Sequence, residues 1–127
     1  MVKRLYIQDQ KGFTLIELIS VMVIMSVVAS VSVKRLDLLS DTATDRAFRD
    51  GVKELNVRES LTWTNIKLSD LGWTNDGDVF SAMDTNLGAD FVWTAGPAAS
   101  GGTLRFRTTT IPLTRTASTT SSVGKWN

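Results

Sequence analysis

The chain changes character at Lys11-Gly12-Phe13-Thr14-Leu15-Ile16-Glu17-Leu18, where a basic leader ends in a glycine and an apolar run begins. The run continues to Val33, and Glu17 is the single charged residue within it. As a helix, this run would be ~30 Å long, which is enough to cross the hydrocarbon core of a bilayer. A charged side chain at that depth costs about 3 kcal/mol, so Glu17 needs an explanation.

The sequence from Gly12 to Leu18 resembles the processing site of type IV prepilins and of the pseudopilins of type II secretion. The resemblance implies that a prepilin peptidase cuts after Gly12 and that the new N-terminal residue, Phe13, is methylated. By the same resemblance, Glu17, the fifth residue of the mature chain, is the glutamate that the family keeps at this position. It also implies that the partners are an inner-membrane assembly platform and other pilins or pseudopilins, with copies of this chain among them. The motif covers about the first quarter of the chain.

Two explanations of Glu17 are open, and they can coexist. In the first, the carboxylate pairs with the amine of Phe13 on a neighbouring copy, because an acid within an apolar helix bundle needs a cation. That pair would fix the axial step of an assembly, while the small residues Ser26, Ala29 and Ser30 would allow close helix packing. In the second, Thr14 and Glu17 form a capping box at the start of the helix.

The amino-acid composition argues against an enzyme. The 127-residue chain contains no histidine and no cysteine, so it has neither the commonest general base nor a thiolate metal site. Its formal net charge is +1, which gives no strong field for binding polyanions. We therefore expect a structural subunit without a cofactor, for which nucleic acid is not the main partner.

The order of leader and apolar run predicts a membrane anchor. An ordinary secretory signal is cut after its apolar region, whereas here the implied cut precedes it, so the helix would stay in the mature protein. Lys3, Arg4 and Lys11 favour a cytoplasmic leader. We expect a single pass through the bacterial inner membrane with the head in the periplasm, or outside the cell after assembly.

The pattern beyond Val33 predicts that the helix continues into the head. Apolar residues recur at spacings of three and four, at Leu36, Leu39, Ala43, Ala47, Phe48, Val52 and Leu55. No proline interrupts this stretch, so we expect one helix over about residues 14–62. The predicted organisation is a leader (1–12), a transmembrane and assembly helix (13–33), and a soluble head (34–127).

The C-terminal third predicts a small antiparallel sheet. Turn-forming residues fill 64–90, with a short helix near 78–83. Strand patterns follow at 91–94, at Gly101 onward and around Ile111–Leu113, and Pro112 indicates an edge position. Trp126 is expected to pin the C-terminal residues to the sheet. The fold class is α+β, a long helix packed on a small antiparallel sheet, which resembles the pilin fold.

Two further candidate sites each have a simpler structural explanation. Asp76, Asp78 and Asp84 are weak calcium candidates, because carboxylate oxygens bind calcium, but Asn75-Asp76-Gly77 is also an ordinary turn sequence. Arg105, Arg107 and Arg115 could form a basic stripe on the sheet, as in nucleic-acid-binding minor pilins at filament tips. The alternative for these arginines is a solvated outer face, since no aromatic residue shares it.

Overall fold

The computed structural model describes residues 12–127, so the leader with Lys3, Arg4 and Lys11 lies outside the described residues. The elements are α1 (Leu15–Lys67), α2 (Asp76–Ala82), β1 (Phe91–Ala98), β2 (Gly101–Phe106), β3 (Thr109–Thr116) and β4 (Lys125–Trp126). The chain forms two compact units that divide between Ser40 and Asp41, and α1 contributes to both. The α+β class predicted from the sequence is confirmed.

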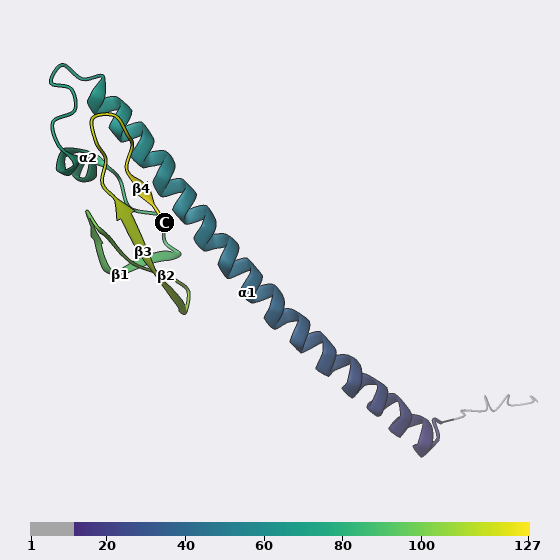
Figure 1. Cartoon of the computed structure of the whole chain (residues 1–127). Helices are drawn as coiled ribbons and strands as arrows, with labels where there is room; N and C mark the ends of the chain where they lie inside the picture. Colours follow the sequence, from purple (N-terminus) through teal and green to yellow (C-terminus); the bar gives the residue numbers. More distant parts are fainter. Residues whose placement is uncertain (1–11) are drawn as a thin grey trace, which may run out of the picture. The chain divides into compact units, whose positions relative to one another are not determined.

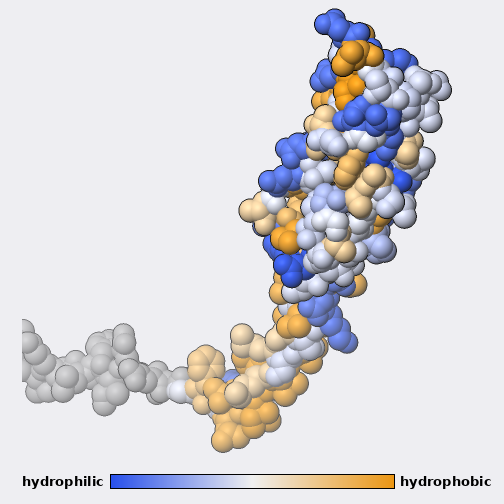
Figure 2. Space-filling view, turned by 90° about the vertical axis from the view of Figure 1, so that its left-hand side faces the viewer, coloured by the Kyte–Doolittle hydropathy of each residue, from blue (hydrophilic) through white to orange (hydrophobic). Residues whose placement is uncertain are grey.

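From Leu15 to Val33, within the first unit, α1 is apolar on every side apart from Glu17. All large apolar side chains of this stretch are exposed, for example Leu15 by 77% and Val33 by 59% (Figure 2). A helix that is apolar all round is stable in lipid or within a bundle, but not alone in water. This helix is the one among the described residues that is long and apolar enough to cross a membrane.

The second unit is built on a four-stranded antiparallel sheet in the order β1-β2-β3-β4 (Figure 1). Strands β1 and β2 pair from Phe91 with Phe106 to Ala98 with Gly101, interrupted by two irregularities. Strands β2 and β3 pair without interruption and are joined by a two-residue turn, while β4 pairs only with Arg115 and Thr116. The sheet is therefore a meander that follows the order of the chain.

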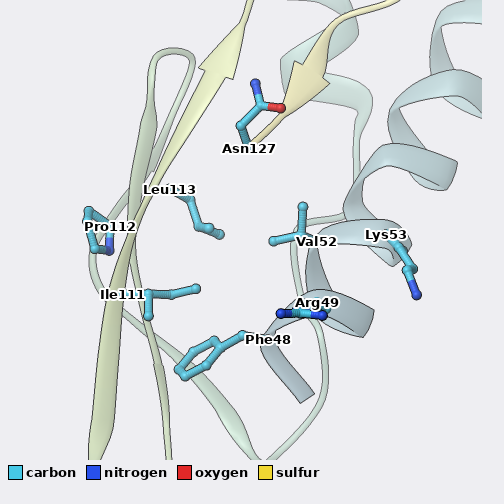
Figure 3. Close-up of a pocket in the computed structure, with 8 residues that line it drawn as sticks. All are labelled: Phe48, Arg49, Val52, Lys53, Ile111, Pro112, Leu113 and Asn127. Atoms are coloured by element: carbon cyan, nitrogen blue, oxygen red, sulfur yellow. The ribbon is translucent and has the colours of Figure 1, made fainter. Parts of the chain in front are cut away.

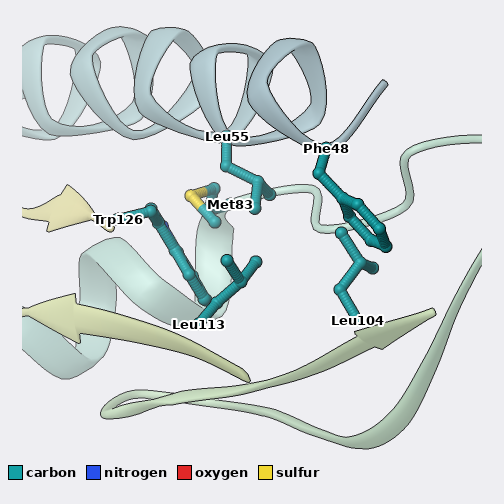
Figure 4. Close-up of a cluster of buried hydrophobic side chains, with 6 residues drawn as sticks. All are labelled: Phe48, Leu55, Met83, Leu104, Leu113 and Trp126. Carbon is teal, nitrogen blue, oxygen red and sulfur yellow. The ribbon is translucent and has the colours of Figure 1, made fainter. Parts of the chain in front are cut away.

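The core of the second unit lies between α1 and the sheet (Figure 4). Because strand side chains alternate between faces, β2 and β3 send Leu104 and Leu113 inward. They meet Leu55 of α1 and Trp126 of β4, both at most 1% exposed. The remaining core members are Phe48, Val79 and Met83. Trp126 thus holds the C-terminal strand against the core, as predicted.

Helix α1 ends five residues later than predicted, because its last turns have partners elsewhere in the second unit. The Trp63 indole nitrogen donates a hydrogen bond to the carbonyl oxygen of Thr119 at 2.9 Å, and the Lys67 ammonium donates to that of Thr120 at 2.5 Å. The predicted short helix is present as α2, which begins two residues earlier and ends one residue earlier than predicted. It begins there because Asn75 caps it by accepting from the Asp78 N–H.

Candidate functional site

Gly12 and Phe13 lie just before α1, separated from it by Thr14, and both are exposed. Phe13 is 86% exposed, and no atom outside its chain neighbours lies within 4 Å of the position that a Cβ on Gly12 would take. The 12–13 peptide bond therefore lies outside regular structure, next to the apolar helix. Another protein could reach this bond without unfolding α1.

Glu17 completes a capping box with Thr14 at the start of α1. One carboxylate oxygen, Oε2, accepts both the Thr14 N–H at 2.8 Å and the Thr14 hydroxyl at 2.9 Å. In return, the Glu17 N–H donates to the Thr14 hydroxyl oxygen at 3.3 Å. The second oxygen, Oε1, accepts no hydrogen bond from any residue of 12–127. The cap is therefore present in the single chain, and it leaves half of the carboxylate available to another partner.

The serines of the apolar segment satisfy their own hydroxyls. Ser20 and Ser26 donate to carbonyl oxygens four residues earlier at 2.7 and 2.6 Å, and Ser30 donates to Val27 at 2.8 Å. No unpaired hydroxyl from these three then faces hydrocarbon. Ser26 and Ser30 thus present small, satisfied surfaces, which is what close helix packing in lipid requires.

A buried ion cluster in the second unit was not predicted from the sequence. Arg115 of β3, 6% exposed, lies between Glu59 of α1, 0% exposed, and Asp76 at the start of α2. The guanidinium donates to Glu59 at 3.0 and 2.5 Å and to Asp76 at 2.7 and 2.7 Å. Its remaining N–H donates to the Ala99 carbonyl oxygen at 3.0 Å, so all five donors are used.

The two carboxylates of this cluster have further donors. The Trp126 indole nitrogen donates to Glu59 at 3.1 Å, and Ser118 donates to Asp76 through its N–H at 2.6 Å and its hydroxyl at 2.7 Å. A Cβ on Gly124 would lie 3.0 Å from the Glu59 Cδ and against its Oε1, so a glycine is needed there. The cluster ties α1, α2, β3 and β4 into one unit.

The cluster shifts the pKa of two of its members. The hydrogen bond from Arg115 lowers the pKa of Asp76 from 3.8 to about 2, against the opposing effect of burial. For Arg115, burial alone would lower the pKa, but hydrogen bonds to Asp76 and Glu59 raise it overall. Both groups therefore stay charged throughout the neutral range.

We expect the head to lose stability below about pH 4 through Asp76. The pKa of Asp76 is lower in the folded chain than the ordinary 3.8, so its contribution is complete above that pH and is lost as the pH falls towards 2. Thermal unfolding followed by tryptophan fluorescence at pH 7 and at pH 2 measures this loss. Asp76→Asn should be less stable at pH 7 and should show a smaller decrease on acidification. A decrease equal to that of the wild type would contradict the assignment.

The predicted basic stripe of Arg105, Arg107 and Arg115 is wrong. Strand alternation sends Arg105 to the outer face of the sheet and Arg115 to the inner face, where the ion cluster uses every donor. Arg107 lies in the β2–β3 turn with φ 55° and stacks on Phe106, with its guanidinium carbon 5.6 Å from the ring centroid. One exposed arginine on the sheet and one in a turn do not make a surface that follows a nucleic-acid backbone.

The three calcium candidates are engaged separately. Asp76 belongs to the ion cluster, Asp78 bonds with Thr74 and Asn75 at the α2 cap, and Asp84 lies 3.4 Å from Arg58. Within residues 12–127, no three acidic side chains form a group that could hold a metal ion.

One sequence signal could have revealed the ion cluster. Glu59 follows Leu55 by four residues, so it lies on the same face of α1 as the core residues Phe48 and Leu55. A carboxylate on that face must be paired when it is buried.

Comparison with known proteins gives one match, which falls on the N-terminal segment. Residues 7–33 match the family model of the prokaryotic N-terminal methylation motif. The match spans Gly12, Phe13, Glu17 and the apolar part of α1, and it does not extend into the second unit. No curated protein and no solved structure matches the chain.

Proposed function

Because residues 7–33 carry the signature of type IV pilins and pseudopilins, we propose that the chain is a structural subunit of a pilus-like filament. In this proposal a prepilin peptidase removes residues 1–12 and the amine of Phe13 is methylated. The apolar helix first anchors the subunit in the inner membrane, with the head in the periplasm, and then enters the filament. The observation that carries the proposal is the methylation motif in register with a membrane-length helix.

The arrangement at Glu17 supports a specific step in assembly. Its Oε2 is taken by Thr14 within the same chain, while Oε1 has no donor in the described part of the chain. When the helices of two copies pack together, the cationic Phe13 amine of one copy can bind this oxygen of the next. Since both charges are costly in an apolar bundle, only the stagger that pairs them is stable. The pair would then set the step between subunits.

The partners follow from this proposal. They are other pilin-like subunits, with copies of this chain among them, the peptidase, and an assembly platform in the inner membrane. The resemblance covers two filament classes, surface type IV pili and the pseudopili of type II secretion, and in both the subunit keeps its hydrophobic helix. A role in protein transport belongs to the second class.

Processing is tested by mass spectrometry of the mature chain. We expect wild-type protein purified from membranes to begin at a methylated Phe13. Gly12→Ala should leave the fold unchanged, because the position is open, but most molecules should keep residues 1–12. Thr110→Ala, a similarly small change on the exposed face of the sheet, is the control and should be processed as the wild type is. A purified, assembled wild-type chain that still begins at Met1 would end the proposal.

A further inference from the structure

The second unit has an open apolar groove between α1 and β3. Its cavity is about 370 Å³, and Phe48 and Val52 of α1 face Ile111 and Leu113 of β3 across it (Figure 3). Arg49, Lys53, Pro112 and Asn127 complete the lining. We call this surface the α1–β3 groove.

The edge of β3 along this groove is open but unsuited to another strand. Thr114 exchanges both of its backbone hydrogen bonds with Asn127, on the side of β3 away from β2. Two residues earlier, Pro112 faces the same side, and none of the described strands pairs with it there. Proline has no N–H to donate, so an added strand would lack a ladder bond. The groove is therefore suited to side chains.

Two cations, Arg49 and Lys53, line the groove. Arg49 makes no ion pair with any residue of 12–127. Lys53 points away from the cavity and lies 3.3 Å from Asp50 (Figure 3). The groove therefore offers an apolar floor with one available guanidinium, which fits apolar side chains next to an acid.

The chain has such a segment at the end of α1. The turn of residues 68–71, which we call the leucine turn, exposes Leu68 by 80% and Leu71 by 89%. Asp70, which lies between them, makes no ion pair in the described part of the chain. Backbone hydrogen bonds from Leu68 to Thr64 and from Gly72 to Ser69 hold the turn in shape. The turn therefore presents two exposed leucines with a carboxylate between them.

From this complementarity we infer that the leucine turn of one copy binds in the α1–β3 groove of another, with Asp70 against Arg49. Val52 and Leu68 are separated along α1 by roughly 24 Å, so one molecule cannot make the contact with itself. The two surfaces differ, so the contact is head-to-tail and can repeat without closing. The inference rests on the proposed function and gives the filament a second contact, made by the heads.

Cysteine cross-linking in the full-length chain tests this contact cleanly, because the natural chain has no cysteine. Two differently tagged copies are co-expressed, one with Leu71→Cys and the other with Val52→Cys, and membranes are oxidised. We expect a disulfide-linked dimer that carries both tags, because bridged cysteines need Cα atoms about 4.4–6.8 Å apart. Each variant expressed alone should give no dimer.

Charge exchange identifies the ion pair. In the cross-linking background, Asp70→Arg should lower the yield of mixed dimer about tenfold, and Arg49→Asp in the partner copy should restore it. Lys53→Asp makes the same charge change four residues away, where the side chain points out of the groove, and should not restore the yield. A yield that does not respond to Asp70→Arg would overturn the pairing.

The proposed function is measured separately in the same membranes. If wild-type chains begin at methylated Phe13 and polymerise, but no mixed dimer forms, the head contact is wrong and the filament proposal stands. Dimers formed by Leu71→Cys alone would show a symmetric contact and would also overturn the inference. If wild-type chains neither lose the leader nor polymerise, the proposed function itself fails.

Discussion

Glu17→Ala is expected to abolish polymerisation while membrane insertion stays intact or improves. The substitution removes a charge whose placement in hydrocarbon costs about 3 kcal/mol, so the helix enters the bilayer more easily. It also removes the acid that would bind the Phe13 amine of a neighbouring copy, which leaves that cation unpaired in an apolar bundle. Membrane fractionation measures insertion, and electron microscopy with sedimentation of sheared filaments measures assembly.

Two further substitutions separate the charge pair from the helix cap. Glu17→Gln keeps an oxygen that can accept from Thr14 but removes the charge, so it should fail to assemble as Glu17→Ala does. Thr14→Ala removes the hydroxyl of the cap but keeps the charge, so filaments should still form, from a helix weakened by about 1 kcal/mol. Normal filaments from Glu17→Gln, with none from Thr14→Ala, would show that the cap alone explains the residue.

Arg115→Ala is expected to destabilise the head by about 3–5 kcal/mol, a large fraction of the stability of a small domain. The change leaves Glu59, 0% exposed, without its cation and removes the donors that hold Asp76. An uncompensated buried charge is costly because the interior solvates it poorly. Thermal unfolding of the full chain in detergent, followed by tryptophan fluorescence, measures the loss.

The matched control is Arg105→Ala, which removes the same side chain from the outer face of the neighbouring strand. Its effect should stay within about 0.5 kcal/mol, as for most exposed positions. Removing the three charges together, with Arg115→Met, Glu59→Leu and Asp76→Asn, should recover much of the lost stability, since apolar replacements of buried ion clusters are often tolerated. Equal losses at Arg105 and Arg115 would show that the buried cluster does not stabilise the head.

The long helix and the sheet could be predicted because the spacing of their apolar residues repeats several times along the chain. The apolar run to Val33 and the spacing from Leu36 to Leu55 indicate a helix over many turns, and the alternation around Leu104 and Phe106 indicates a strand. The predicted end of α1 is five residues too early, because hydrogen bonds from Trp63 and Lys67 to residues 119 and 120 stabilise its last turns. Strand β4 has two residues, too few to show a period.

The N-terminal motif can be read directly from the sequence, whereas for the ion cluster the sequence indicates only the burial of Glu59. Gly12, Phe13 and Glu17 are close together in the chain, so the motif that they form is visible in the sequence, and it falls within the match to the N-terminal methylation motif. Glu59, Asp76 and Arg115 meet only after α1, α2 and β3 have packed. Asp76 and Arg115 each have an ordinary explanation as a surface charge, and the position of Glu59 on the core face of α1 does not identify its partners. The alternation of side chains along β3 did not predict that Arg115 is buried, because the face to which Arg115 points depends on the register of the strand.

The Arg115 cluster fixes the last strand without a covalent bond, which has a consequence for where the subunit can mature. A cross-link between cysteines forms only where an oxidant is present and is lost to reducing agents. The ion pairs of one guanidinium with two carboxylates form when α1, α2 and β3 pack together, in any redox environment. The head should therefore mature without a thiol oxidase and should be unaffected by dithiothreitol.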